Sequence, residues 1–283
     1  MTLRVETYDQ LDAAARAVAS NQSARFLGGG TLVMRAVNDG DQSFDTIIRA
    51  NDPAFRTIQS HGDRITIGAG ATMADILKNR DLAFLAPAAR AVGGPAIRNM
   101  ASVGGNLFAR SPYGDFATAL LVLDAEVNLV SGSSGASGSG QSGTGPGTGL
   151  QDFLAARDRE PRALVASVTI TRPRDQNAFR FVKVSRVKPK GVSVLSIAAN
   201  LQQSGGRISN AMVAYGAMGP IPVRALAVER ALQGATLNET GIAAALAAAT
   251  DGINPATDPI ASEWYRRAVA PVHLKRLLLG ERT

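Results

Sequence analysis

The stretch from Ala101 to Leu120, ASVGGNLFARSPYGDFATAL, constrains the fold more than any other part of the chain. Two adjacent glycines and Asn106 precede a turn that carries a single carboxylate, Asp115. Glycine weakens helices and strands, so this pair indicates either a tight turn or a close approach of another group to the backbone. Successive backbone N–H groups in such turns form anion-binding concavities. The stretch is therefore a candidate site for an anionic or flat ligand.

A second glycine run, Gly28-Gly29-Gly30-Thr31, follows a predicted strand earlier in the chain. Neither run has the G-x-G-x-x-G pattern of a dinucleotide fold or the Lys-Ser/Thr ending of a phosphate loop. Either run alone indicates a structural turn as readily as a binding site. Together they predict that two separated turns hold one diphosphate, with added donors from Thr31, Ser102 and Asn106. Asp115 is suited to accept from a ribose or ribityl hydroxyl, or to cap the apolar helix that follows it.

Length and charge narrow the class of protein. A chain of 283 residues suggests about two domains. No apolar run approaches the roughly 18 residues of a membrane span, and the N-terminus lacks a secretory pattern, so we expect a cytoplasmic protein. The net charge is +7, but Lys and Arg are dispersed and only four Tyr and one Trp are present, which disfavours nucleic-acid binding. An anionic ligand or an acidic partner subunit fits the charge equally well.

The chain contains no cysteine, which excludes disulfides and an iron–sulfur cluster held by its own thiolates. Its two histidines, His61 and His273, lie far apart in the sequence, so a zinc site or a histidine-based triad is not expected. Any redox chemistry must therefore come from a bound organic cofactor.

Periodicity and turn residues predict alternating helices and strands up to Pro173 and mainly antiparallel strands, then helices, beyond it. Asp9 and Thr72 are the expected N-caps of two of the helices. Residues 131–149 are almost all Gly and Ser and cannot bury a core, so we expect a flexible segment there. Helices are predicted at 8–20, 73–78, 85–92, 225–233, 241–250 and 261–279, and a Ser-Gly-Gly hairpin turn at 204–206.

Several segments carry a resemblance to a known family. ASVGGNLFARSPYGD and FLGGGTLV resemble the two FAD-binding segments of the medium subunits of molybdenum hydroxylases, the xanthine dehydrogenase and carbon monoxide dehydrogenase family. AMGPIPVRALAVERAL and SEWYRRAVAPVHLKRLLL are similar to that family's C-terminal domain. The likeness covers nearly the whole chain except the Gly/Ser segment.

The resemblance implies an α+β fold: a two-lobed FAD-binding domain of the PCMH type, followed by a smaller α+β domain. The lobes would be residues 1–53 and 54–172, with 131–149 as the flexible segment. Residues 173–283 would form the C-terminal domain, a three-stranded antiparallel sheet with helices on one face.

By the same resemblance, FAD would lie extended between the lobes. Val92, Val165 and Val192 would line the flavin, and Lys183 would stand near it, where a cation stabilises the reduced anionic ring. Gly191 stands where the family commonly has an acidic residue, unlike the form that uses NAD. The implied cofactor-binding residues are Phe26, Leu27, Gly28, Gly29, Gly30, Thr31, Leu32, Val33, Val92, Ser102, Val103, Gly104, Gly105, Asn106, Asp115, Val165, Lys183 and Val192.

The function that the resemblance implies is that of an FAD-containing electron-transfer subunit, with no catalytic acid or base and no metal of its own. Electrons would come from [2Fe–2S] clusters on a small partner subunit. A large partner subunit would carry the molybdenum cofactor. The acceptor could be quinone, oxygen, NAD or a carrier protein. Two alternatives stay open: a self-contained flavin oxidoreductase of the same fold, and a flavin-free structural subunit.

Overall fold

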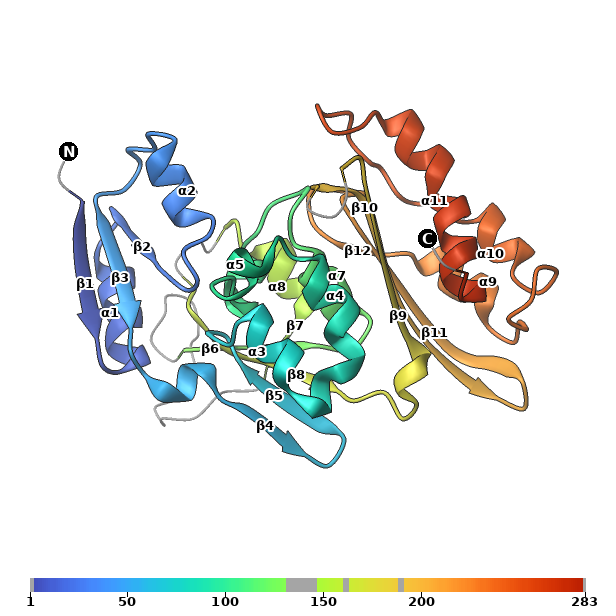
Figure 1. Ribbon diagram of the computed structural model, residues 1–283, viewed down its shortest axis with the longest axis horizontal. Helices are drawn as coiled ribbons and strands as arrows, with labels where there is room; N and C mark the ends of the chain where they lie inside the picture. Colours follow the sequence, from blue (N-terminus) through green and yellow to red (C-terminus); the bar gives the residue numbers. More distant parts are fainter. Residues whose placement is uncertain (1–2, 131–146, 160–162, 188–190, 282–283) are drawn as a thin grey trace.

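Three sheets follow one another along the chain in the computed structural model, which describes residues 3–130, 147–159, 163–187 and 191–281 (Figure 1). The N-terminal sheet and the helical C-terminal layer lie at opposite ends, with the second sheet and its helices between them. The predicted α+β class is confirmed. None of the described helices is long and apolar enough to cross a membrane.

The N-terminal lobe is a parallel sheet with the strand order β1-β3-β2, and buried residues of α1 pack on it. Arg4–Tyr8 pairs with β3, so the helix that we expected from Tyr8 begins only at Leu11. The expected N-cap was also wrong: Gln10 occupies that position and its side chain makes no capping bond. The elements are β1 (Arg4–Tyr8), α1 (Leu11–Ser20), β2 (Ala24–Phe26), α2 (Val33–Asn38) and β3 (Thr46–Ala50).

The central lobe is an antiparallel sheet with the strand order β4-β5-β8-β6-β7, packed against short helices. Thr72 caps α3 as expected, in a reciprocal capping box with Asp75. Most of the Gly/Ser segment lies outside the described residues, but its end, Thr148–Gly149, pairs with β6 as a short strand. The strands are β4 (Ile58–His61), β5 (Arg64–Gly68), β6 (Glu126–Leu129), β7 (Thr148–Gly149) and β8 (Val165–Thr171). The helices are η1 (Pro53–Arg56), α3 (Met73–Lys78), η2 (Arg80–Leu85), α4 (Ala86–Ala91), α5 (Pro95–Arg98), α6 (Val103–Leu107), α7 (Asp115–Leu121) and α8 (Leu150–Ala156).

The C-terminal domain is an antiparallel sheet with the order β12-β11-β10-β9, in which the two-residue β12 extends the three strands that we expected. Alternate residues of β10 face opposite sides: Ala198 joins the core of the central lobe, while Ile197 packs with the C-terminal helices. The sheet is thus covered by its own helices on one face and by the central lobe on the other. The elements are η3 (Gln176–Ala178), β9 (Phe179–Ser185), β10 (Ser193–Ser204), β11 (Arg207–Gly216), β12 (Val223–Arg224), α9 (Leu226–Leu232), α10 (Ala243–Ala247) and α11 (Glu263–Leu279).

Candidate functional site: a cavity between the lobes

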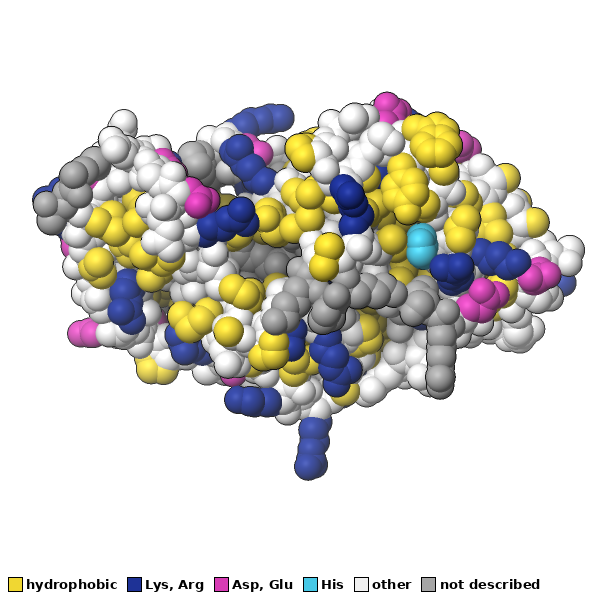
Figure 2. Space-filling model, turned by 45° about the horizontal axis from the view of Figure 1, so that its top comes forward, with side chains coloured by type: hydrophobic (Ala, Val, Ile, Leu, Met, Phe, Trp, Pro, Cys, Tyr) yellow, Lys and Arg dark blue, Asp and Glu magenta, His cyan; other side chains and the backbone are white. Residues whose placement is uncertain are grey.

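A cavity of about 380 Å³ lies where the N-terminal lobe, the central lobe and the C-terminal sheet meet. Figure 2 shows the surface hollowed between the N-terminal part and the rest, with hydrophobic and basic side chains around the hollow. Of the residues that the sequence pointed to, all line this cavity except Leu27 and Val103. Val103 is fully buried in the central core, and Leu27 packs beside Gly30.

The first glycine turn lines the cavity and contains backbone donors that find no acceptor among the described residues. Leu27 N–H still donates to the Ile48 carbonyl of β3, at 2.8 Å, and Met34 N–H donates to Gly30 as α2 begins. Between them, the N–H groups of Gly28 to Thr31 have no acceptor among the described residues. Buried or half-buried backbone donors are rarely left unpaired in folded proteins. Their arrangement therefore fits an anionic ligand.

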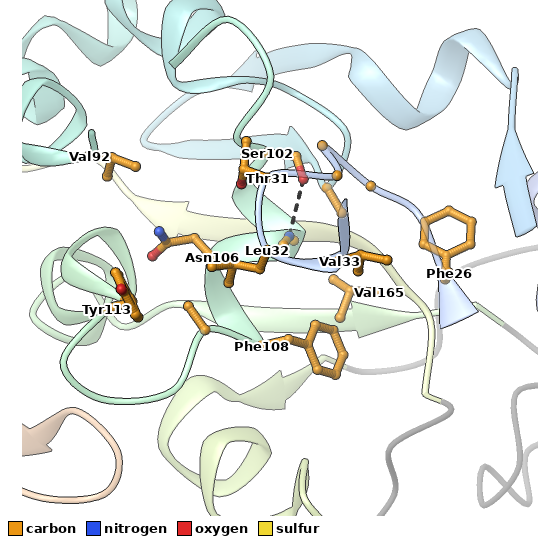
Figure 3. Close-up of a pocket in the computed structure, with 18 of the residues that line it drawn as sticks. Phe26, Thr31, Leu32, Val33, Val92, Ser102, Asn106, Phe108, Tyr113 and Val165 are labelled. Carbon is orange, nitrogen blue, oxygen red and sulfur yellow. Dashed lines mark hydrogen bonds between the residues drawn. The ribbon is translucent and has the colours of Figure 1, made fainter. Parts of the chain in front are cut away.

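The second glycine turn differs from our expectation. Val103 and Gly104 donate to the carbonyls of Ala71 and Ala69, at 2.9 and 2.7 Å. Gly105 N–H donates to Ser102 Oγ, which caps α6, at 3.2 Å (Figure 3). These amides already have acceptors, so the second turn does not supply a second set of free donors. Gly104 and Gly105 instead form a part of the cavity wall that carries no side chains.

The two turns lie directly against each other, which explains the glycines between them. A Cβ on Gly29 would stand 1.8 Å from the Met100 carbonyl oxygen, and one on Gly28 would stand 2.8 Å from Ser102 Oγ. Gly105 is different: it is exposed on the cavity side, and only Ser102 Oγ lies near its Cβ position, at 2.9 Å. Packing requires glycine at Gly29, and also at Gly104, whose Cβ would stand 2.8 Å from Ala69 Cβ, whereas Gly105 leaves open space on the cavity side.

A buried ion pair forms one end of the cavity. Lys183 Nζ lies 2.8 Å from Asp115 Oδ2 and donates to the Ala91 carbonyl at 3.0 Å, while Ser193 Oγ donates to Asp115 Oδ1 at 2.6 Å. The two side chains are 15% and 8% exposed. The alternative that Asp115 caps α7 is wrong, because Gly114 is the N-cap and the carboxylate makes no capping bond. A carboxylate has about four acceptor positions, so Asp115 can still accept from a ligand hydroxyl.

The apolar residues of the site fall into two groups. Val92 directly follows Ala91, whose carbonyl accepts from Lys183 Nζ. Val92 therefore lies at the end of the cavity that contains the buried ion pair. Figure 3 shows Val165 drawn close to Phe108 and well apart from Val92. The two valines thus line different parts of the cavity. The basic residues 188–190, which follow the KVSR segment, lie outside the described residues.

Sequence reasoning overlooked three aromatic side chains that line the cavity, Phe55, Phe108 and Tyr113. Phe108 and Tyr113 stand in the glycine-rich stretch with which the sequence analysis began, so their place next to the turn was the available signal. Phe108 packs edge-on against Phe153, with ring centroids 5.6 Å apart. The described residues contain no cluster of three or more side chains suited to a metal ion.

Residues 2–171 match the family model of the FAD binding domain in molybdopterin dehydrogenase, and residues 180–280 match that of the CO dehydrogenase flavoprotein C-terminal domain. The chain belongs to this family. Its resemblance to the FAD-binding medium subunits of molybdenum hydroxylases, an oxidoreductase family, is thereby confirmed.

Relatives of this family align along nearly the full chain. The glyceraldehyde dehydrogenase medium chain of Sulfolobus acidocaldarius is 27% identical, covering 93% of this chain and 92% of its own. The xanthine dehydrogenase FAD-binding subunit of Escherichia coli O157:H7 is 26% identical, covering 92% and 89%.

Solved structures show the same fold. The carbon monoxide dehydrogenase of Hydrogenophaga pseudoflava superposes with a TM-score of 0.87 at 22% identity, over 98% of this chain and 96% of that one. Quinoline 2-oxidoreductase of Pseudomonas putida 86 gives 0.85 at 21% identity, over 99% and 96%.

Proposed function

We propose that this chain binds FAD in the cavity between its lobes and is the electron-transfer subunit of a multi-subunit molybdenum hydroxylase. The observation that carries the proposal is that the backbone N–H groups from Gly28 to Thr31 have no acceptor among the described residues, in a turn that lines a cavity, in a family with an FAD binding domain. Backbone donors of this kind suit a diphosphate. When bound, FAD supplies the redox chemistry, since it exchanges electrons singly or in pairs.

The chain's own residues position the cofactor. The first turn would hold the diphosphate, while Gly105 leaves room for it and Ser102 offers a hydroxyl. Asp115 would accept from a polyol hydroxyl, and Lys183 would hold a positive charge at the same end. Since Lys183 is fixed by Asp115 and Ala91, its charge stays in place without reorganisation.

The proposed partners rest on the absence of cysteine in this chain and on its membership of the family of molybdenum hydroxylase subunits. Without cysteine it cannot hold iron–sulfur clusters, so electrons would reach it from [2Fe–2S] clusters on a small subunit. A large subunit would hold the molybdenum cofactor and act on the substrate. The external acceptor would be quinone, oxygen, NAD or a carrier protein.

The test begins with the chain purified together with whatever accompanies it. We expect a flavin absorbance spectrum, release of FAD on denaturation, and co-purification of a cysteine-rich small subunit and a large one. A chain that stays colourless and takes up no added FAD would overturn the proposal in favour of a structural subunit. A flavin-loaded chain that turns over a substrate without partners would favour a self-contained oxidoreductase.

A substitution at Gly105 tests the place of the cofactor. Gly105→Val fills open space in the cavity and should weaken FAD binding about tenfold to hundredfold, as overpacking typically does. Gly149→Val is the matched control, because its Cβ position meets only Asp152 Oδ2, at 3.7 Å, outside the cavity. Affinity is measured by titration with FAD, and folding by thermal unfolding of the FAD-free chain. Unchanged affinity in a folded Gly105→Val chain contradicts this placement.

A further inference from the structure

A hydrogen bond joins the N-terminal lobe to the central lobe at the edge of the cavity. Arg35 Nη1, on α2, donates to the phenol oxygen of Tyr113 at 2.9 Å. Tyr113 lines the cavity, and Figure 3 shows its side chain next to that of Asn106, with Val92 further away. Both residues are partly open to solvent, since Tyr113 is 39% exposed and the Arg35 side chain is 62% exposed. The pair therefore lies at the mouth of the cavity rather than at its base.

Polar contacts between the two lobes are sparse among the described residues. Among pairs of described residues, the bond between Arg35 and Tyr113 is the only hydrogen bond or ion pair that connects residues 3–51 with residues 56–281. The other contacts between the lobes are packing, such as Phe26 edge-on to Phe55 and Gly29 against Met100. Arg35 and Tyr113 thus give the N-terminal lobe a directional polar attachment to the central lobe.

Arg35 is held in place for this contact from its own helix. Its Nε lies 3.5 Å from Oδ2 of Asp39, the residue that follows the end of α2, while Nη1 donates to the tyrosine. A hydrogen bond from a charged donor is stronger than one between neutral groups.

We propose that Arg35 and Tyr113 form a clasp that closes the mouth of the cofactor cavity and slows the release of FAD. The proposal rests on the FAD binding proposed above. A cofactor held between two lobes leaves when the lobes separate or the mouth opens, and either movement breaks this bond first. The clasp is therefore a barrier to both exit and entry. Its loss should raise the dissociation and association rates together and change the equilibrium affinity less.

The test compares Arg35→Ala, Tyr113→Phe and the double variant with the wild-type chain, each at full length and loaded with FAD. The rate of FAD release is followed by the rise of free-flavin fluorescence after dilution, and the association rate by stopped flow. Either single variant should release FAD about three- to tenfold faster, the range expected for one partly exposed charge-assisted hydrogen bond. Because both changes break the same bond, the double variant should be no faster than the single ones.

Arg16→Ala is the matched control. Arg16 is an equally exposed arginine of the same lobe, 64% exposed, and its ion pair with Asp12 stays within α1. Its release rate should equal that of the wild type. Single variants within twofold of the wild type, or a double variant whose effect is the product of the two, would overturn the clasp. Failure of the wild-type chain to bind FAD would instead overturn the proposed function.

Discussion

At the residue scale, glycines that look alike in the sequence serve different purposes. Gly29 has no room for a side chain, because the Met100 carbonyl oxygen stands where its Cβ would be. Gly105 borders the cavity and meets only the hydroxyl of Ser102. The first glycine lets two lobes pack closely, and the second keeps a binding space open.

This difference predicts that substitution by alanine changes the free energy of unfolding strongly at Gly29 and only slightly at Gly105. Gly29→Ala should lower the free energy of unfolding by about 1–3 kcal/mol, because the backbone at Met100 must move. Gly105→Ala should lower it by no more than about 1 kcal/mol, since only the Ser102 hydroxyl has to move and at most its capping bond to Gly105 N–H is lost. Urea unfolding of the FAD-free chains measures both. Equal stability of the two variants would show that the turns do not abut.

At the scale of elements, α11 is fastened to the strand that carries part of the site. Arg266 is 1% exposed and donates from Nε to the Val194 carbonyl of β10, at 3.0 Å. Its Nη2 bonds both oxygens of Asp258, at 3.0 and 2.9 Å. Ser193, next to Val194, holds Asp115. The C-terminal helix is thus connected to the buried ion pair of the cavity through one strand.

The link between Asp258 and Arg266 predicts a pH dependence. Burial raises the pKa of Asp258, but the Ala261 N–H and the Arg266 guanidinium outweigh it and hold the pKa below the ordinary value of 3.8. A lowered folded-state pKa means that this stabilisation is complete well above pH 3.8 and is lost as the pH falls through the folded pKa.

Asp258→Asn should therefore lower the unfolding free energy by about 1–3 kcal/mol at pH 7, and the difference from the wild type should shrink as the pH falls below 3.8. Denaturant unfolding at a series of pH values measures this. A difference that stays constant down to acid pH would contradict the assignment. Glu239→Gln is the control, because Glu239 pairs with Lys275 at the exposed surface and its removal should have little effect at any pH.

At the scale of the whole molecule, three separately formed sheets surround one cavity. A ligand that fills the cavity contacts all of them and stabilises only the assembled arrangement. Within the part of the chain that the structure describes, the N-terminal and central lobes share few polar contacts, so a ligand between them adds to the free energy that keeps them together.

FAD at one hundred times its dissociation constant should raise the unfolding free energy by about 2.7 kcal/mol. Riboflavin, which lacks the phosphates, should stabilise much less at the same concentration, because the N–H groups of Gly28–Thr31 then face no anion. Thermal unfolding with each ligand gives the comparison. Equal stabilisation by both ligands would contradict the diphosphate assignment.

Much of the fold was predictable from local sequence. Thr72 caps its helix as expected, the glycines at 205 and 206 make the predicted hairpin, and the two glycine turns indicated the cavity. The first strand was missed because Arg4–Tyr8 is largely exposed and gains its structure from pairing with β3.

The sequence by itself determined where the chain turns, where glycine runs leave the backbone without side chains, and to which family the chain belongs. These properties depend on residues that are close along the chain. Only the tertiary structure decided which turn keeps free N–H groups and which residues meet. Lys183 reaches Asp115 across 68 positions and Arg35 reaches Tyr113 across 78. Such pairs form when the surfaces of different sheets and helices pack against each other. Neither the neighbouring residues nor the spacing of residues along the chain specifies that packing.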